Sequence, residues 1–198
     1  MERLTETILE KVKPLPEGTP VSAKMLMHLG TRAAIDQSLS RLVRRGQLLR
    51  AGRGLYVSPV RSRFGSHAPS VQRLVEELSV QRGETIVPSG ATSANALGLT
   101  TQVPTRTVYL TSGRSRKLML GKQVVHLQHV PSWQLALAKE PAGEIVRALA
   151  WAGPERAQEV LKEIGGKVPP SELQKINQHI SLFPGWMANA LSQSAMYA

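Results

Sequence analysis

Apolar residues recur once per helical turn in the first part of the chain and then give way to short apolar runs. Leucine, isoleucine and valine residues one turn apart predict an amphipathic helix over residues 3–13. A stretch rich in proline and glycine ends this helix. Ser22 is then a suitable N-cap for a second, short helix over residues 23–29.

The next apolar stripe predicts a third helix, capped by Thr31 and running to about Arg45. Gly46 ends it, and two short apolar runs follow, residues 48–51 and 55–57. The tripeptide Gly-Arg-Gly between these runs is typical of a tight hairpin turn. The order helix, helix, turn, helix, hairpin predicts a winged helix-turn-helix domain over residues 1–60.

The remaining pattern mixes strands and helices. Residues 61–68 have the composition of a linker, and residues 69–198 are expected to form a second domain. Its predicted elements are a helix over 69–82, strands near 84–87, 106–111, 116–120 and 123–130, a short helix over 91–97, and helices from Ser132 onward. The predicted fold class is therefore α+β: an N-terminal winged helix-turn-helix followed by a mixed α/β domain with a small antiparallel sheet and a helical C-terminus.

Charge is unevenly distributed between these two parts. The chain has 25 Lys and Arg against 14 Asp and Glu, for a net charge of +11. Residues 1–66 hold 12 basic and 5 acidic side chains, whereas the much longer remainder holds 13 and 9. A balance this basic favours a polyanionic partner such as nucleic acid, and the smaller domain has the larger share of the charge.

The third helix is the predicted reading element for double-stranded DNA, because the second helix of a helix-turn-helix lies in the major groove. Between Gln37 and Val75 there is no acidic residue, and all eight basic residues are arginines, which favours bidentate or minor-groove contacts. Arginine and glutamine can each bind a purine with two hydrogen bonds. The candidate DNA-binding residues are Thr31, Arg32, Gln37, Ser40, Arg41, Arg44, Arg45, Arg50 and Arg53. Arg53 is expected at the tip of the wing, and Arg45 could instead cap the helix C-terminus.

A second basic cluster lies in the second domain. It consists of Arg114, Arg116, Lys117 and Lys122, and no acidic residue occurs between Thr85 and Lys139. This surface could extend the DNA footprint or bind an acidic surface of a protein partner. It could equally be an exposed hairpin with ordinary solubilising charge.

Candidate catalytic and metal-binding residues are scarce. The chain has no cysteine, a single aspartate (Asp36), and no compact cluster of carboxylates. His126 and His129 are three residues apart on a predicted strand, so their side chains should point to opposite faces. Ser89, between a strand and a helix, is better explained as a cap than as a nucleophile. The sequence therefore predicts a protein that is not an enzyme and has no metal or cofactor.

One part of the chain is similar to a known family. The wing RAGRGLYVSP, followed by PSGATSANALGLTTQVPTRTVYLTSGRSRKL, resembles the AbiEi-like antitoxins of bacterial type IV toxin–antitoxin systems. The resemblance covers residues 5–140, and its most specific part runs from SGATSANALGLTTQVP to YLTSG. It implies an autorepressor that binds repeats in the promoter of its own operon and counteracts a separately encoded nucleotidyltransferase-like toxin. It does not imply a stable complex with that toxin.

Two other functions are alternatives to this one. The first is a solitary winged-helix regulator whose second domain senses a ligand or a protein. The second is an enzyme that acts on nucleic acid, and the lack of cysteine, the single aspartate and the absence of a plausible triad weigh against it. A neighbouring toxin gene would separate the antitoxin from the solitary regulator. Turnover of labelled DNA or RNA with Mg²⁺ or Mn²⁺ would reveal the enzyme. No apolar stretch is long enough to cross a membrane, and acidic residues stand where a signal peptide needs positive charge, so a cytoplasmic protein is expected.

Overall fold

The computed structural model describes residues 2–63 and 65–195. The fold is α+β, as predicted, with helices, small antiparallel sheets and a helical C-terminus. The chain divides into two compact units. Unit 1 consists of Met1–Glu84 and Arg116–His126, and unit 2 consists of Thr85–Ser115 and Leu127–Ala198.

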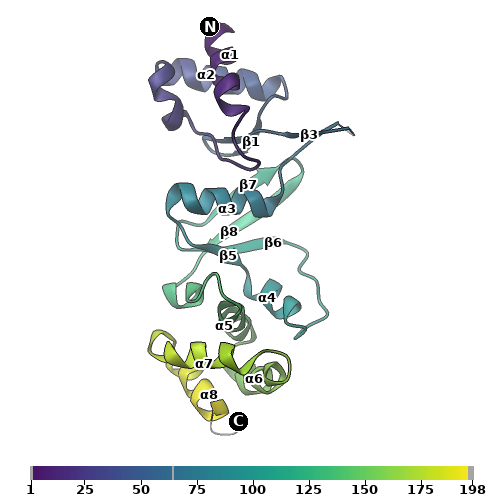
Figure 1. The fold of residues 1–198 in the computed structure, drawn as a ribbon, viewed down its shortest axis with the longest axis vertical. Coiled ribbons are helices and arrows are strands. Elements are labelled where there is room, and N and C mark those ends of the chain that lie inside the picture. Colours follow the sequence, from purple (N-terminus) through teal and green to yellow (C-terminus); the bar gives the residue numbers. More distant parts are fainter. Residues whose placement is uncertain (1, 64, 196–198) are drawn as a thin grey trace. The chain divides into compact units, whose positions relative to one another are not determined.

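The first part of unit 1 contains helices and a hairpin in an order compatible with a winged helix (Figure 1). The elements are α1 (Glu2–Val12), the 3₁₀-helix η1 (Ala23–Leu29), α2 (Arg32–Arg44), β1 (Leu49–Gly52) and β2 (Leu55–Val57). Their buried side chains form one core, with Ile8, Ile35, Leu39 and Leu42 fully buried. The apolar stripes of the two α-helices therefore face each other, and the polar face of α2 is left outside.

A contact between distant segments attaches the hairpin to this helical core. Val21, in the loop before η1, pairs with Tyr56 of β2 through two backbone hydrogen bonds of 2.7 and 2.9 Å. The segment after it is a 3₁₀-helix without a Ser22 side-chain cap, which differs from the predicted capped helix. This helix is only seven residues long. Its first turn is closed by a hydrogen bond of 3.1 Å from the Met25 N–H to the carbonyl of Ser22, three residues earlier, which is the spacing of a 3₁₀-helix.

The rest of unit 1 begins with a second hairpin and a helix. Residues 61–68, predicted as a linker, contain most of the antiparallel pair β3 (Val60–Ser62) and β4 (Gly65–His67). The helix α3 (Val71–Arg82) follows, capped by Ser70 and ended by Gly83 in the left-handed conformation (φ +63°). Hydrogen bonds join α3 to the loop before η1, including one from the Gln81 amide to the Pro20 carbonyl at 2.8 Å.

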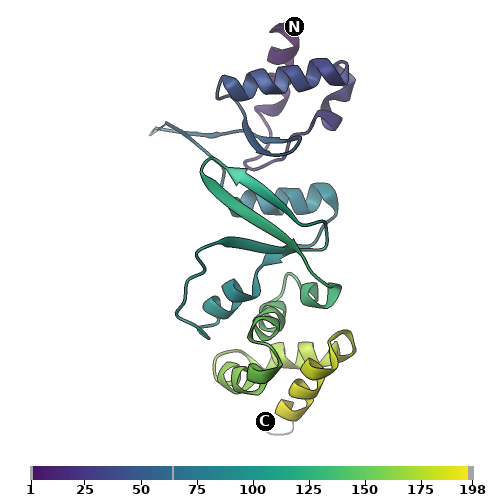
Figure 2. The same cartoon turned by 180° about the vertical axis from the view of Figure 1, so that it is seen from behind.

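Four strands form one sheet in the order β5-β6-β8-β7, and β5 at its edge pairs antiparallel with β6. They are β5 (Ile86–Pro88), β6 (Thr107–Thr111), β7 (Arg116–Leu120) and β8 (Gln123–His129). In unit 1, α3 covers one face of β7 and the start of β8 (Figure 1, Figure 2). The buried Leu74 and Leu78 of α3 and Leu118 and Leu120 of β7 supply apolar surface for this packing.

Unit 2 is mainly helical (Figure 1). Its helices are α4 (Gly90–Ala96), η2 (Ser132–Leu135), α5 (Pro141–Ala152), η3 (Pro154–Arg156), α6 (Ala157–Gly165), α7 (Pro170–Gln178), η4 (Ile180–Leu182) and α8 (Gly185–Ala195). Pro141, Pro154 and Pro170 each occupy the first position of a helix, where the missing N–H of proline costs no hydrogen bond. The core of this unit is built around α5, which packs against α4, α6 and α7.

The start of α5 is held by a carboxylate from α7. Glu172 Oε2 accepts a hydrogen bond from the Ala142 backbone N–H at 3.0 Å, and Lys175 lies 2.9 Å from the other oxygen. The hydrogen bond from Lys175 holds the pKa of Glu172 below its ordinary value. A negative charge at a helix N-terminus is favourable, so this contact fixes where α5 begins. Among the residues that the structure describes, no helix is long and apolar enough to cross a membrane.

Candidate nucleic-acid interface

The helix α2 is positioned by its cap and its buried stripe. Thr31 Oγ1 accepts a hydrogen bond from the Ala34 N–H at 3.4 Å, which confirms the predicted N-cap. Ile35, Leu39 and Leu42 are completely buried. Because these side chains occupy one face, the opposite face of α2 is turned to solvent along its full length.

The predicted reading residues of α2 are mostly on that outer face. Arg32, Gln37, Ser40, Arg44 and Arg45 are exposed, as is the cap Thr31, and Arg41 is half-buried. Arg45 occupies the C-cap position, where its backbone N–H donates to the Arg41 carbonyl. These residues are thus accessible to a ligand along the helix; their contact with DNA stays a prediction.

An ion pair that sequence reasoning missed engages one of these arginines. Arg32 Nε donates to Asp36 Oδ2 at 2.8 Å, and both side chains are about half exposed. Ser40 Oγ in turn donates to the Asp36 carbonyl at 2.8 Å. The spacing of four residues between Arg32 and Asp36 could have predicted this pair. An exposed pair contributes at most about 1 kcal/mol, so a phosphate or a base could displace the carboxylate at small cost.

The β1–β2 hairpin presents the other predicted arginines. Arg53 and Gly54 form its two-residue turn, and Gly54 adopts a positive φ of +66°. Arg53 and Arg50 are both exposed. They line a groove of about 470 Å³ together with Leu49, Gly52, Met119 and Gly121. Met119 and Gly121 belong to the β7–β8 hairpin. The β1–β2 hairpin, the predicted wing, therefore has an extended surface beside it within unit 1.

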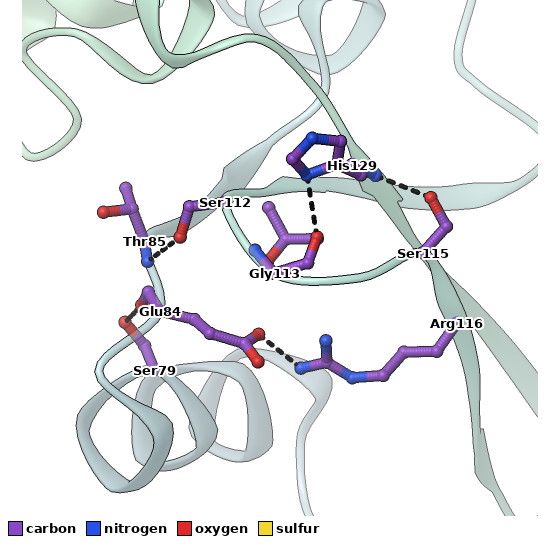
Figure 3. Close-up of polar contacts among 9 residues, drawn as sticks. Ser79, Glu84, Thr85, Ser112, Gly113, Ser115, Arg116 and His129 are labelled. Atoms are coloured by element: carbon purple, nitrogen blue, oxygen red, sulfur yellow. Dashed lines mark hydrogen bonds and ion pairs between the residues drawn. The ribbon is translucent and has the colours of Figure 1, made fainter.

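The four residues of the second basic cluster have different surroundings. Lys117 and Lys122 are exposed on the β7–β8 hairpin of unit 1, near the wing groove. Arg116 instead makes a largely buried ion pair with Glu84 at 2.6 Å (Figure 3). Arg114 belongs to unit 2. Of these four residues, Lys117 and Lys122 are the two that add accessible charge to unit 1 beside Arg50 and Arg53.

The Arg116–Glu84 pair should stabilise unit 1. Its side chains are only 20% and 16% exposed, and it joins β7 to the end of α3. Arg116→Ala should lower the free energy of unfolding by about 2 kcal/mol, because the carboxylate would stay largely buried without this partner. Chemical denaturation would measure this loss. Arg156→Ala, which removes an exposed pair with Glu159, is the control and should change stability by about 0.5 kcal/mol or less. Equal losses in the two variants would contradict the stabilising role.

Histidine and serine candidates have structural contacts. The His129 ring donates from Nδ1 to the Gly113 carbonyl at 2.9 Å, and its backbone N–H donates to Ser115 Oγ at 2.9 Å (Figure 3). The loop between β6 and β7 is thereby fixed. Ser89 accepts a hydrogen bond from the Thr92 N–H, which confirms its predicted role as the cap of α4. No group of three histidine or acidic residues that could hold a metal occurs in the described ranges.

Comparison with known proteins places the chain in a family. The sequence pattern of a family of unknown function, DUF6088, matches residues 7–176, which cover most of both units. The chain belongs to the DUF6088 family. No curated protein and no solved structure matches it.

Proposed function

We propose that this DUF6088 protein is a sequence-specific double-stranded DNA-binding protein that reads the major groove with the outer face of α2. The observation that carries the proposal is the exposure of Gln37, Arg44 and their neighbours opposite a completely buried stripe. A helix held rigidly by its core and covered with arginine and glutamine outside has the donor groups that purine edges accept.

The wing and its groove supply the second contact. Arg53 at the turn and Arg50 on β1 suit the DNA backbone or the adjacent minor groove, where arginine is favoured by the negative potential. Lys117 and Lys122 would add phosphate contacts from the same unit. Such contacts do not read sequence, but they set orientation and provide much of the affinity.

The biological role we propose is autorepression combined with antitoxin activity. It is supported by the resemblance of the wing and of residues 88–118 to AbiEi-like antitoxins. The protein would act in the cytoplasm, bind repeats in the promoter of its own operon and counteract a nucleotidyltransferase-like toxin without a stable complex. A solitary regulator is the second candidate, favoured by a ligand-sized pocket in unit 2. A toxin gene beside this gene supports the first function, and its absence supports the second.

The binding step can be tested directly with the full chain. Fluorescence anisotropy should show a Kd on the order of 10 nM for the DNA upstream of its own gene, and much weaker binding to a shuffled duplex of equal composition. Affinity should fall by roughly 1,000-fold between about 50 and 200 mM salt, because several phosphates are neutralised. Equal affinity for the shuffled duplex would contradict sequence reading by α2.

A further inference from the structure

Unit 2 contains a pocket that DNA binding does not use. It has a volume of about 410 Å³, and its wall is formed by residues of α4, α5, β6, β8, η2 and adjoining loops. Arg147, Arg106, Gln128, Gln134 and Trp151 are among the lining residues. A pocket of this size with a few polar groups in a largely apolar wall is typical of a small-molecule site.

Arg147, on α5, is the unusual residue of this pocket. It is only 1% exposed, although arginine is almost never fully buried without a partner. Its Nε and Nη1 atoms are buried and have no hydrogen-bond acceptor among the described residues. Burial lowers the pKa of the guanidinium, and the charge of Glu144, one turn earlier, opposes this effect. A buried cation with unused hydrogen-bond donors lowers the stability of the fold. A bound ligand that carries an acceptor group would remove this cost.

The packing of α4 against α5 keeps this region closed on one side. Gly90 begins α4 directly over the Arg147 carbonyl, and an added Cβ there would lie 2.7 Å from the Trp151 Cβ. No side chain can therefore separate the two helices at this point. The wall that holds Arg147 and Trp151 is therefore closely packed on this side, which favours a preformed binding site.

The other lining residues indicate the chemistry of the rest of the ligand, beyond the group that accepts hydrogen bonds from Arg147. Trp151, one turn after Arg147 on α5, is 42% exposed and offers an apolar ring at the pocket. Val108 and Ala150 add apolar surface, and the amides of Gln128 and Gln134 offer donors and acceptors. Arg106, which is exposed, adds a second positive charge. The lining therefore combines positive charge with a flat apolar surface.

We propose that this pocket binds a small molecule in which a carboxylate or phosphate group is attached to a flat ring. The oxyanion accepts hydrogen bonds from the Arg147 guanidinium, whose planar donor set matches both groups. The ring lies against Trp151 and the neighbouring apolar side chains. This site is separate from the proposed DNA interface, since all the residues named belong to unit 2.

Isothermal titration calorimetry on the full chain tests the proposal with four probes. Benzoate and phenyl phosphate carry the ring with each oxyanion, and acetate and inorganic phosphate carry the oxyanion alone. At least one ring-bearing probe should bind with a Kd on the order of 1 mM or below, and more tightly than its ringless counterpart. The tighter of benzoate and phenyl phosphate identifies the class of ligand.

Matched variants locate the binding. Arg147→Met should weaken the binding of the best probe at least about tenfold, because the charged donors are lost. It should leave the melting temperature unchanged or raise it, since methionine fills the space without a buried charge. Arg156→Met is the same change at an exposed arginine directly before α6, and this variant should bind the probe as tightly as the unchanged protein does. Binding that survives Arg147→Met, or no binding by any probe, would overturn the proposal.

A measurement on the unchanged protein guards against misfolding of the Arg147 variant. Two-dimensional NMR of the tryptophan indole N–H groups, assigned with Trp151→Phe and Trp186→Phe, should show that the probe shifts the Trp151 signal. The Trp186 signal, which comes from the core of the C-terminal helices, should not move. A shift of Trp186 without one of Trp151 would place the probe elsewhere and refute the site.

Discussion

Simultaneous replacement of Arg41 and Arg44 by alanine is expected to weaken the binding of operator DNA at least about 100-fold, which is the largest effect of a substitution on function that we predict. Arg44 is exposed and Arg41 half-buried on α2, so both guanidinium groups are close to the helix surface that would enter the groove. A bidentate contact to a base contributes about 1–3 kcal/mol, and two such contacts account for the loss. Fluorescence anisotropy with the upstream DNA would measure it.

The control for this double variant removes the same charge elsewhere. Arg156→Ala combined with Lys162→Ala takes two exposed positive charges from unit 2, and binding should change by less than about threefold at moderate salt. Circular dichroism of both variants should show an unchanged helix content, because the buried stripe of α2 is intact. If the Arg41 and Arg44 variant binds its promoter as tightly as the control, α2 is not the reading helix.

Gly90→Ala is expected to cause the largest loss of stability, lowering the free energy of unfolding by about 3 kcal/mol. The added Cβ would overlap the Arg147 backbone carbonyl and crowd the Trp151 Cβ at 2.7 Å. Backbone atoms of α5 cannot rotate away as a flexible side chain can, so α4 would have to shift as a whole. Chemical denaturation followed by tryptophan fluorescence would measure the loss, since all three tryptophans lie in unit 2.

The same substitution at another glycine of unit 2 separates crowding from a general effect of alanine. Gly165, at the end of α6, has no atom within 4 Å of an added Cβ. Gly165→Ala should therefore be neutral or stabilise the protein by up to about 1 kcal/mol, since alanine favours a helix. A loss of stability as large at Gly165 as at Gly90 would show that the close approach of α4 and α5 is not the cause.

Local features of the fold were predictable from the sequence because neighbouring residues determine them. The apolar stripe of α2, its Thr31 cap and the Gly52-Arg53-Gly54 turn depend on residues within a few positions of one another. The same holds for β7, whose bounds Arg116–Leu120 match the prediction. Side-chain periodicity and turn residues carry enough information to place such elements.

Features that depend on distant contacts were not predictable in this way. The pairing of Val21 with Tyr56 and the Arg116–Glu84 ion pair join segments that are more than 30 residues apart. The burial of Arg147 is a further example, although a signal was present: it stands among apolar residues in EIVRALAWA. A helix that is apolar on nearly all sides is usually buried as a whole. The burial of an arginine within such a helix could have been inferred from this pattern.

The path of the chain through unit 1 has a consequence for how this protein can be divided. The polypeptide leaves the unit after Glu84, re-enters at Arg116 and leaves again after His126. The hairpin that carries Arg53 packs beside β7, where Leu118 lies 3.8 Å from the position of a Cβ on Gly52. The surface that would meet DNA is thus encoded by two separate stretches of gene. Residues 1–60 transplanted alone into another protein would lack β7 beside the β1–β2 hairpin, so this module is expected to fold fully only together with a strand that lies much later in the chain.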